Sequence, residues 1–166
     1  MEACIHLPAL RALVIGYGNP LRGDDALGSR VVDALAAIPA IADDPFIRVE
    51  TVHQLTPELA EAIADAEIVI FIDATASSPD LAPGTLHCEE IDPASQSHEA
   101  LGHHLTPAQA LAYASRVFGA NPKGYMASVT AESFDYGATL SPAVDAAIPS
   151  LVQWIRARIE SGCVPA

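Results

Sequence analysis

One apolar run, residues 67–73 (EIVIFID), constrains the fold of this chain more than any other feature. Its interior is continuously hydrophobic, which is typical of a strand that is buried on both faces of a parallel sheet. Residues 10–16 (LRALVIG) have the same character, and Gly16 and Gly18 end the strand pattern. Two such strands predict a sheet that is covered by helices on both sides.

Strand and helix patterns alternate along the rest of the chain. Further strands are predicted at residues 46–53, 85–91 and 124–130. Helices are predicted after an acidic pair and after three pairs of a hydroxyl residue with proline. These pairs are Asp24-Asp25, Thr56-Pro57, Thr106-Pro107 and Ser141-Pro142. The last helix should kink or break at Pro149. The order β-α-β-α-β-β-α-β-α predicts a single α/β domain over residues 1–166. It would have three layers, with helices on both faces of a mostly parallel, twisted sheet of about five strands.

Composition limits the possible functions. Apolar residues make up 51% of the 166 residues and charged residues 17%, so the chain can bury a core and is not intrinsically disordered. The 8 Lys and Arg against 21 Asp and Glu give a net charge of −13, which disfavours nucleic acid and anionic membranes as partners. No uncharged apolar stretch is long enough for a transmembrane helix. The charge permits a small molecule, a metal or a basic polypeptide as partner, and it also serves solubility alone.

The cysteines and the N-terminus indicate the compartment. Cys4, Cys88 and Cys163 are far apart and form no C-x-x-C pair, so neither a disulfide framework nor an all-cysteine zinc site is expected. The N-terminus lacks the basic and apolar regions of a secretory signal. We therefore expect a cytoplasmic protein in a reducing setting and, for a chain of this size, a monomer.

The loop after the first strand, residues 16–28 (GYGNPLRGDDALG), lies where open α/β sheets bind ligands. It is not a dinucleotide loop, because Leu21 stands where a third glycine would allow close packing of helix on strand. It is not a Walker loop, because Asp24 and Asp25 replace the lysine and the hydroxyl residue, and two carboxylates would repel a phosphate. The same carboxylates suit a divalent cation.

Three acids are candidate site residues, and each has a purely structural alternative. Asp24 is well placed as a helix N-cap. Asp25 either has a specific role or only favours the helix dipole. Asp73 closes the apolar strand at the edge of the sheet where ligands bind, and the alternative is that it caps the following turn.

Two adjacent histidines, His103 and His104, have the most site-like placement, because they precede the helix opened by Thr106-Pro107. The alternative is that a loop histidine is merely solvated. Two aspartates and a histidine from separate loops can form a mixed oxygen and nitrogen metal site with open positions. The remaining histidines are interpreted as ordinary ones; they are His6, His53, His87 and His98.

The assembled pattern resembles the hydrogenase maturation protease family. The likeness runs from about residue 13 to about residue 151 and is carried by five short motifs. They are residues 13–28 (LVIGYGNPLRGDDALG), 72–74 (IDA), 103–107 (HHLTP), 131–134 (AESF) and 140–142 (LSP). The first motif is the most specific. One departure is Ala26, where many members have glycine; a left-handed backbone there would strain alanine, whereas a helical one would suit it.

The resemblance implies a single α/β domain and a peptidase activity. Such proteases cleave a short C-terminal extension from the large-subunit precursor of a nickel–iron hydrogenase after nickel insertion. The three family residues that contact metal fall on Asp25, Asp73 and His103. His103 is preferred to His104 because an aliphatic residue, Leu105, follows it at the second position. The implied metal is nickel, carried by the substrate and not held as a permanent cofactor.

Two routes to peptide hydrolysis stay open on the sequence. The metal polarises the scissile carbonyl or activates water, or Asp25 or Asp73 acts as the catalytic general base of an aspartic-type peptidase. The chain contains no H-E-x-x-H motif and no recognisable serine or cysteine nucleophile. Two other functions are alternatives: a non-hydrolytic, flavodoxin-like module that binds a small ligand, and an inactive relative that acts as a binding chaperone for the precursor.

Overall fold

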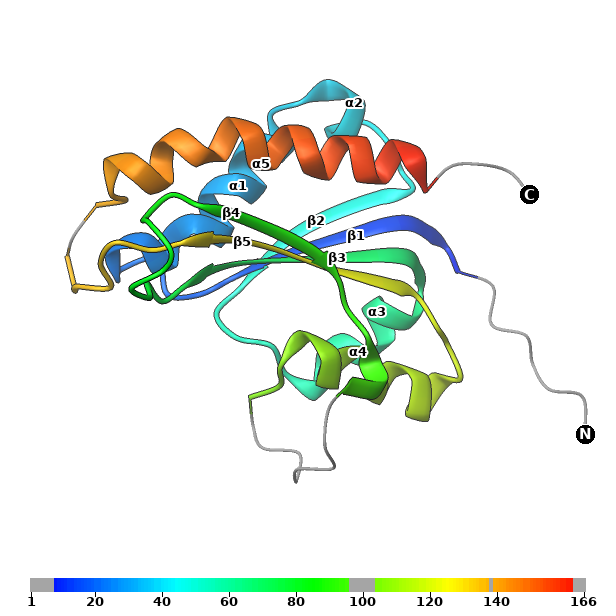
Figure 1. The fold of residues 1–166 in the computed structure, drawn as a ribbon. Coiled ribbons are helices and arrows are strands. Elements are labelled where there is room, and N and C mark those ends of the chain that lie inside the picture. The colour runs from blue at the N-terminus through cyan, green and yellow to red at the C-terminus, as the bar shows by residue number, and fades with distance from the viewer. Residues whose placement is uncertain (1–7, 96–103, 138, 163–166) are drawn as a thin grey trace, which may run out of the picture.

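Within the residues that the structure describes, five strands make up the central sheet. They are β1 (Leu10–Tyr17), β2 (Ile47–Val52), β3 (Ala66–Thr75), β4 (Leu86–Glu90) and β5 (Lys123–Thr130). Their order across the sheet is β2-β1-β3-β5-β4, and of the five only β4 runs antiparallel to its neighbour. The arrangement comes from a computed structural model that describes residues 8–95, 104–137 and 139–162 (Figure 1).

Helices cover both faces of this sheet, as Figure 1 shows. One face carries α1 (Leu27–Ala36), α2 (Pro39–Ala42) and α5 (Pro142–Ser161), and the other carries α3 (Ala60–Ala64) and α4 (Pro107–Phe118). The described residues also contain short 3-10 helices, η1 (Gly23–Ala26), η2 (Pro57–Leu59) and η3 (Pro93–Ser95). The predicted fold class, an α/β protein with a mostly parallel sheet between two helical layers, is confirmed.

Strand β3 is buried on both faces, as its apolar run predicts. Val69 and Phe71 pack into the core under α3 and α4, whereas Ile70 and Ile72 pack into the core under α1 and α5. All four side chains are fully buried. Full burial of one such side chain is worth roughly 1.5–3 kcal/mol. A shift of the strand by one residue would move each of these side chains to the other face, so their burial fixes the face on which each residue of β3 lies.

The predicted start of α4 is confirmed in atomic detail. The Gln109 N–H donates to the Thr106 hydroxyl, and the Thr106 N–H donates to the Gln109 side chain, so the two residues form a capping box. The corresponding signal at Thr56 begins only a short 3-10 turn, which α3 then follows. The cap therefore predicts where a helix begins but not how long it becomes.

Helix α5 continues without a break through Pro149 to Ser161, so of the two alternatives predicted at this proline, a kink or a break, the break is wrong. Proline removes one backbone hydrogen bond from a helix, and burial of an apolar stripe on the sheet outweighs that loss. The buried residues of the stripe are Val144, Leu151, Ile155 and Ile159. Neither α5 nor any other helix in the described ranges is long and apolar enough to cross a membrane.

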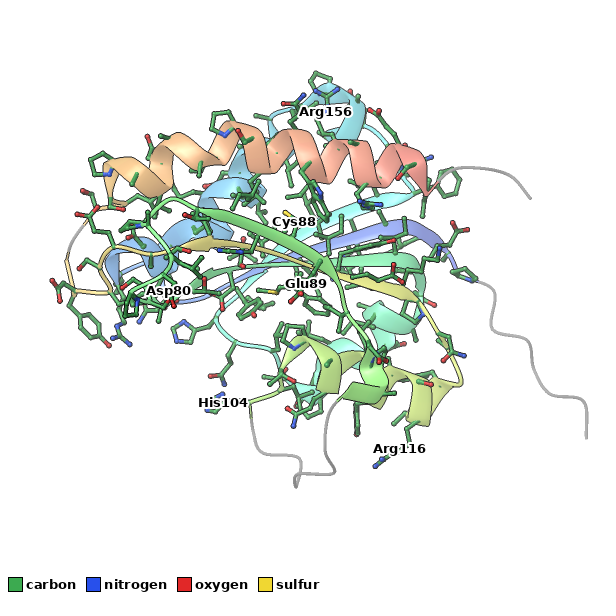
Figure 2. The ribbon with its side chains drawn as sticks, viewed as in Figure 1. Asp80, Cys88, Glu89, His104, Arg116 and Arg156 are labelled. Carbon is green, nitrogen blue, oxygen red and sulfur yellow. The ribbon has the colours of Figure 1, made fainter. Side chains whose placement is uncertain are left out.

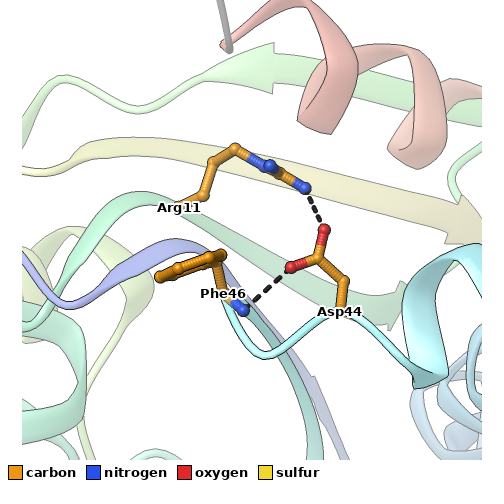
Figure 3. A network of polar contacts seen from close by, with 3 residues as sticks. All are labelled: Arg11, Asp44 and Phe46. Carbon is orange, nitrogen blue, oxygen red and sulfur yellow. Dashed lines mark hydrogen bonds and ion pairs between the residues drawn. The ribbon is translucent and has the colours of Figure 1, made fainter.

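A small polar network joins β1 to the turn before β2 at the amino edge of the sheet. The Arg11 guanidinium bonds one oxygen of Asp44, and the other oxygen accepts from the Phe46 N–H at 2.9 Å (Figure 3). The Phe46 N–H, with Arg11, holds the pKa of Asp44 below its usual range. This contact stabilises the edge of the sheet that faces away from the candidate site residues.

Candidate active site

The loop after β1 packs the first turn of α1 directly against the strand. A Cβ atom on Gly16 would lie 2.3 Å from the Gly28 carbonyl oxygen, and one on Gly28 would lie 2.6 Å from the Tyr17 nitrogen. Both positions therefore require glycine. Leu21, which stands at the third glycine of a dinucleotide loop, is 68% exposed. The close contact between helix and strand is thus made by a different glycine pair from the one that a dinucleotide loop uses.

The same loop orients Asp25. The Asn19 N–H donates to Asp25 Oδ2 at 2.7 Å, and the Asn19 side chain accepts from the Leu21 N–H at 2.9 Å. Gly18 has a φ of 131°, and a Cβ there would lie 2.3 Å from the Asp25 carbonyl oxygen. The Asp25 carboxylate is therefore turned back toward the loop and is only partly buried. The structural alternative for Asp25 was that it only favours the helix dipole. The hydrogen bond from Asn19 shows that its carboxylate is also held in a defined position.

Asp24 is fully buried, and its predicted role as a helix N-cap is wrong. Its carboxylate accepts the N–H groups of Glu132 (2.7 Å), Ser133 (3.1 Å) and Ser141 (2.7 Å), and also the Ser141 hydroxyl (2.9 Å). Burial alone would raise the pKa of Asp24, but these hydrogen bonds outweigh it and hold the pKa below its usual range. Asp24 therefore ties η1 to the segment between β5 and α5.

Asp73 lies near the carboxyl end of β3, two residues after Phe71 and hence on the α3 and α4 side of the sheet. Burial is the largest cause that raises the pKa of Asp73, which reaches about 7. The Ala74 N–H, which donates to Oδ1 at 2.8 Å, opposes the rise, as does a hydrogen bond from Tyr17, whereas the charge of Asp25 adds to it. This carboxyl group can therefore take up and release a proton near neutral pH.

Asp25, Asp73 and Tyr17 form one coupled cluster. Burial, then the neighbouring Asp73 and finally Asp25, raise the pKa of the Tyr17 hydroxyl far above its usual value, so it stays protonated and donates to Asp73. Tyr17 was not among the site residues predicted from the sequence. Strand register explains its place, because Gly16 pairs with Ile72 and the next residues along the two strands are Tyr17 and Asp73.

The predicted histidine ligand, His103, lies outside the described residues. His104 is exposed at the start of the segment that leads into α4 (Figure 2). The next residue, Leu105, is buried and donates its N–H to the Leu55 carbonyl at 2.9 Å. The segment therefore approaches the sheet on the α3 and α4 side, which is also the side of Asp73.

The described part of the predicted ligand set is the acid pair Asp25 and Asp73. Carboxylate oxygens are ligands for hard and borderline divalent cations. Within the residues that the structure describes, no three His, Cys, Asp or Glu side chains form a group that would hold a metal ion. Ala26 has helical backbone angles (φ −77°, ψ −4°), so alanine is unstrained at the position where many family members have glycine.

The fold and the site together define a class of protein. Two coupled carboxylates lie at the carboxyl edge of a mostly parallel α/β sheet, and the loop beside them carries two acids where a nucleotide-binding loop would hold a phosphate. Such a pair serves cation binding or acid–base catalysis.

Comparisons with known proteins agree with this class. The hydrogenase 2 maturation protease of Escherichia coli (strain K12) is 35% identical over 158 residues, which cover 92% of this chain and 93% of that protein. The solved structure of the hydrogenase-maturating endopeptidase HybD from E. coli has a TM-score of 0.74 at 28% identity, covering 93% of this chain and 94% of its own. A hydrogenase 2 maturation peptidase from Thaumarchaeota archaeon SCGC_AB-539-E09 has a TM-score of 0.66 at 25% identity, covering 90% and 98%. No family model matches the chain.

The chain belongs to the hydrogenase maturation protease family. The resemblance seen in its motifs is therefore confirmed, and so is the expectation that it is a peptidase.

Proposed function

We propose that the chain is the endopeptidase that removes the C-terminal extension of a nickel–iron hydrogenase large-subunit precursor after nickel has been inserted. The observation that carries this proposal is the coupled acid pair Asp25 and Asp73, found at the carboxyl edge of the sheet in a chain of the maturation protease family. The E. coli relative is named for the maturation of hydrogenase 2, and its similarity extends over nearly the whole chain. The precursor is accordingly the proposed partner.

Nickel recognition is the second part of the proposal. Asp25, Asp73 and His103 would contact the nickel of the immature large subunit, so the metal belongs to the substrate and is not a resident cofactor. A contact with the metal itself gives different affinities for the nickel-loaded and the empty precursor, and a protease needs such a difference to distinguish them. The two acids support this part of the proposal because they are partly exposed and electrostatically coupled.

Two routes are open for the hydrolytic step. In one, the substrate's nickel polarises the scissile carbonyl or activates water. In the other, Asp73 or Asp25 accepts a proton from the attacking water and returns it to the leaving amine. The pKa of Asp73, at about 7, suits both transfers, and the Tyr17 hydrogen bond orients its carboxylate. Asp25 is oriented by the Asn19 N–H.

Processing of the purified precursor in vitro tests the proposal. Nickel-loaded precursor should shift in electrophoretic mobility with the wild-type protein, and nickel-free precursor should not. Asp25→Asn and Asp73→Asn should each slow cleavage by roughly 100-fold or more, the usual contribution of an acid–base group. Asp33→Asn, at an exposed position on α1, is the matched control and should cleave at the wild-type rate.

Each alternative has its own outcome in this experiment. Stable binding of the precursor without cleavage would identify the chain as an inactive binding chaperone. Equal cleavage of nickel-loaded and nickel-free precursor would leave the peptidase intact but overturn nickel recognition. If the precursor were neither bound nor cleaved, the alternative of a non-hydrolytic, flavodoxin-like module would be favoured instead.

The compartment and the assembly complete the proposal. Cysteines that are far apart in the sequence, with a free thiol at Cys88, fit the reducing cytoplasm. We place the reaction there and treat the protein as a monomer.

A further inference from the structure

A row of polar side chains crosses four strands at the level of Asp73. In the pairing register, Asp73 of β3 lies opposite Ser128 of β5, and Ser128 lies opposite His87 of β4. Tyr17 of β1 occupies the matching position on the other side of Asp73, because Gly16 pairs with Ile72. Side chains that lie directly opposite one another in a sheet project from the same face.

The packing of the neighbouring residues identifies that face. Leu86 and Cys88 of β4 pack against the core under α1 and α5. Figure 2 shows Cys88 on the side of β4 toward α5 and Glu89 on the opposite side. By alternation, His87 lies with Glu89 on the α3 and α4 side of the sheet. The row therefore shares a face with Asp73.

Two members of the row, Ser128 and His87, can make hydrogen bonds beyond those seen within the protein. Ser128 is 4% exposed and Thr130 is fully buried, and both lie near the carboxyl end of β5. The ring nitrogen Nε2 of His87 is 3.4 Å from the Thr130 hydroxyl, at the long end of hydrogen bonding. The His87 imidazole and the Ser128 hydroxyl each keep capacity to donate and accept hydrogen bonds, so both can bind a ligand that lies along this row.

We propose that His87, together with Ser128, binds the main chain of the precursor's C-terminal segment beside the scissile bond; this inference rests on the proposed function. Neighbouring strands lie about 4.8 Å apart, so His87 is two strands, or roughly 10 Å, from Asp73. An extended peptide covers that distance in about three residues. The imidazole and the hydroxyl donate and accept hydrogen bonds, as peptide N–H and C=O groups require. From the sequence, His87 was interpreted as an ordinary histidine, and the strand register places it in the same row as Asp73.

Cleavage kinetics with the nickel-loaded precursor at varied concentration test this inference. His87→Ala should raise KM roughly three- to tenfold, the effect of one hydrogen bond, while kcat stays within about twofold. His87→Gln places an amide near the former ring nitrogen and should restore most of the wild-type KM. Cys88→Ala, on the opposite face of the same strand, is the matched control and should leave KM unchanged.

The outcomes separate this inference from the proposed function. Wild-type cleavage combined with an unchanged KM for His87→Ala would overturn the substrate contact alone. If His87→Ala and Cys88→Ala changed kcat and KM to a similar extent, the role of His87 would be structural, and the substrate contact would again be overturned. If His87→Ala does not fold, Ser128→Ala should raise KM in the same way. A wild-type protein that leaves the precursor uncut would overturn the proposed function itself.

Discussion

Asp24 and Asp25 are sequence neighbours with different physical tasks. Asp24 is fully buried and accepts four hydrogen bonds from Glu132, Ser133 and Ser141. Asp25 is partly exposed and accepts one backbone N–H from Asn19. One acid therefore stabilises the fold, and the other is available to a ligand.

Asp24→Ala and Asp25→Ala should separate stability from function. Asp24→Ala leaves buried N–H groups unpaired, and we expect the free energy of unfolding to fall by about 3 kcal/mol or more, since each hydrogen bond to a charged group is worth roughly 1.5–3 kcal/mol. Asp25→Ala should cost about 1 kcal/mol or less. Urea unfolding at pH 7 measures both values. Equal losses in the two variants would contradict this division of roles.

Asp73 should make the protein less stable as pH rises. Its pKa is about 7 in the folded protein against an ordinary value of 3.8. Between these two values the folded state binds more protons than the unfolded state, so the stability that is present below pH 3.8 is lost progressively up to about pH 7. Asp73→Asn, which cannot ionise, should be less sensitive to pH over this window and more stable than wild type at pH 8.

Urea unfolding at several pH values from 4 to 8 checks the behaviour of Asp73. Asp33→Asn, which alters an exposed acid on α1, is the control and should follow the wild-type curve. A wild-type protein whose stability rises through the same window, with no difference from Asp73→Asn, would refute the raised pKa.

The sequence could predict part of this site. Asp25 comes after the loop that follows one apolar parallel strand, and Asp73 lies near the end of another, so the rule that such strand ends meet at one edge of the sheet predicted that the two acids lie at the same edge. The role of Asp24 could not be predicted, because its partners lie 108 to 117 residues away and a local capping rule does not include them. Tyr17 and His87 were missed for a similar reason: strand register places them, and register is not visible in a single run of residues.

At the scale of elements, α1 and β1 meet through backbone and not through side chains. Gly28→Ala would place a Cβ 2.6 Å from the Tyr17 nitrogen. We expect a loss of about 1–3 kcal/mol from the forced shift, and a loss of cleavage activity because Tyr17 contacts Asp73. Arg30→Ala, on the exposed face of the same helix, is the control and should change stability by less than about 0.5 kcal/mol. An unaffected Gly28→Ala protein would mean that the helix can move away freely.

The boundaries of the elements divide into those set by local chemistry and those set by packing. The capping box of Thr106 and Gln109 is local, so the start of α4 could be predicted. The continuity of α5 through Pro149 depends on an apolar stripe that packs on the sheet, which a local proline rule does not weigh. Backbone angles at Ala26 were undecidable from the sequence, because both helical and left-handed conformations were compatible with it.

At the scale of the whole molecule, the two edges of the sheet formed by the strand ends have different roles. At the amino edge Arg11 contacts Asp44 and stabilises the sheet, and at the carboxyl edge lie the candidate site residues Asp25 and Asp73. Two like charges at the carboxyl edge, one of them largely buried, cost stability. A divalent cation that binds both carboxylates would remove this repulsion, so cation binding should raise the free energy of unfolding of the whole protein.

Thermal unfolding with added ligands tests this coupling and the choice between the candidate functions. A cation present at about 100 times its Kd stabilises a protein by roughly 2.7 kcal/mol, and for a chain of this length each kcal/mol raises Tm by about 2–4 °C. Nickel or cadmium should therefore raise Tm by roughly 5–10 °C, and Asp25→Ala should abolish the rise. Nucleotides should have no effect, because two acids replace the phosphate-binding residues of the loop. A Tm that responds to nucleotides and not to nickel would instead assign the carboxyl edge to a small phosphate-bearing ligand.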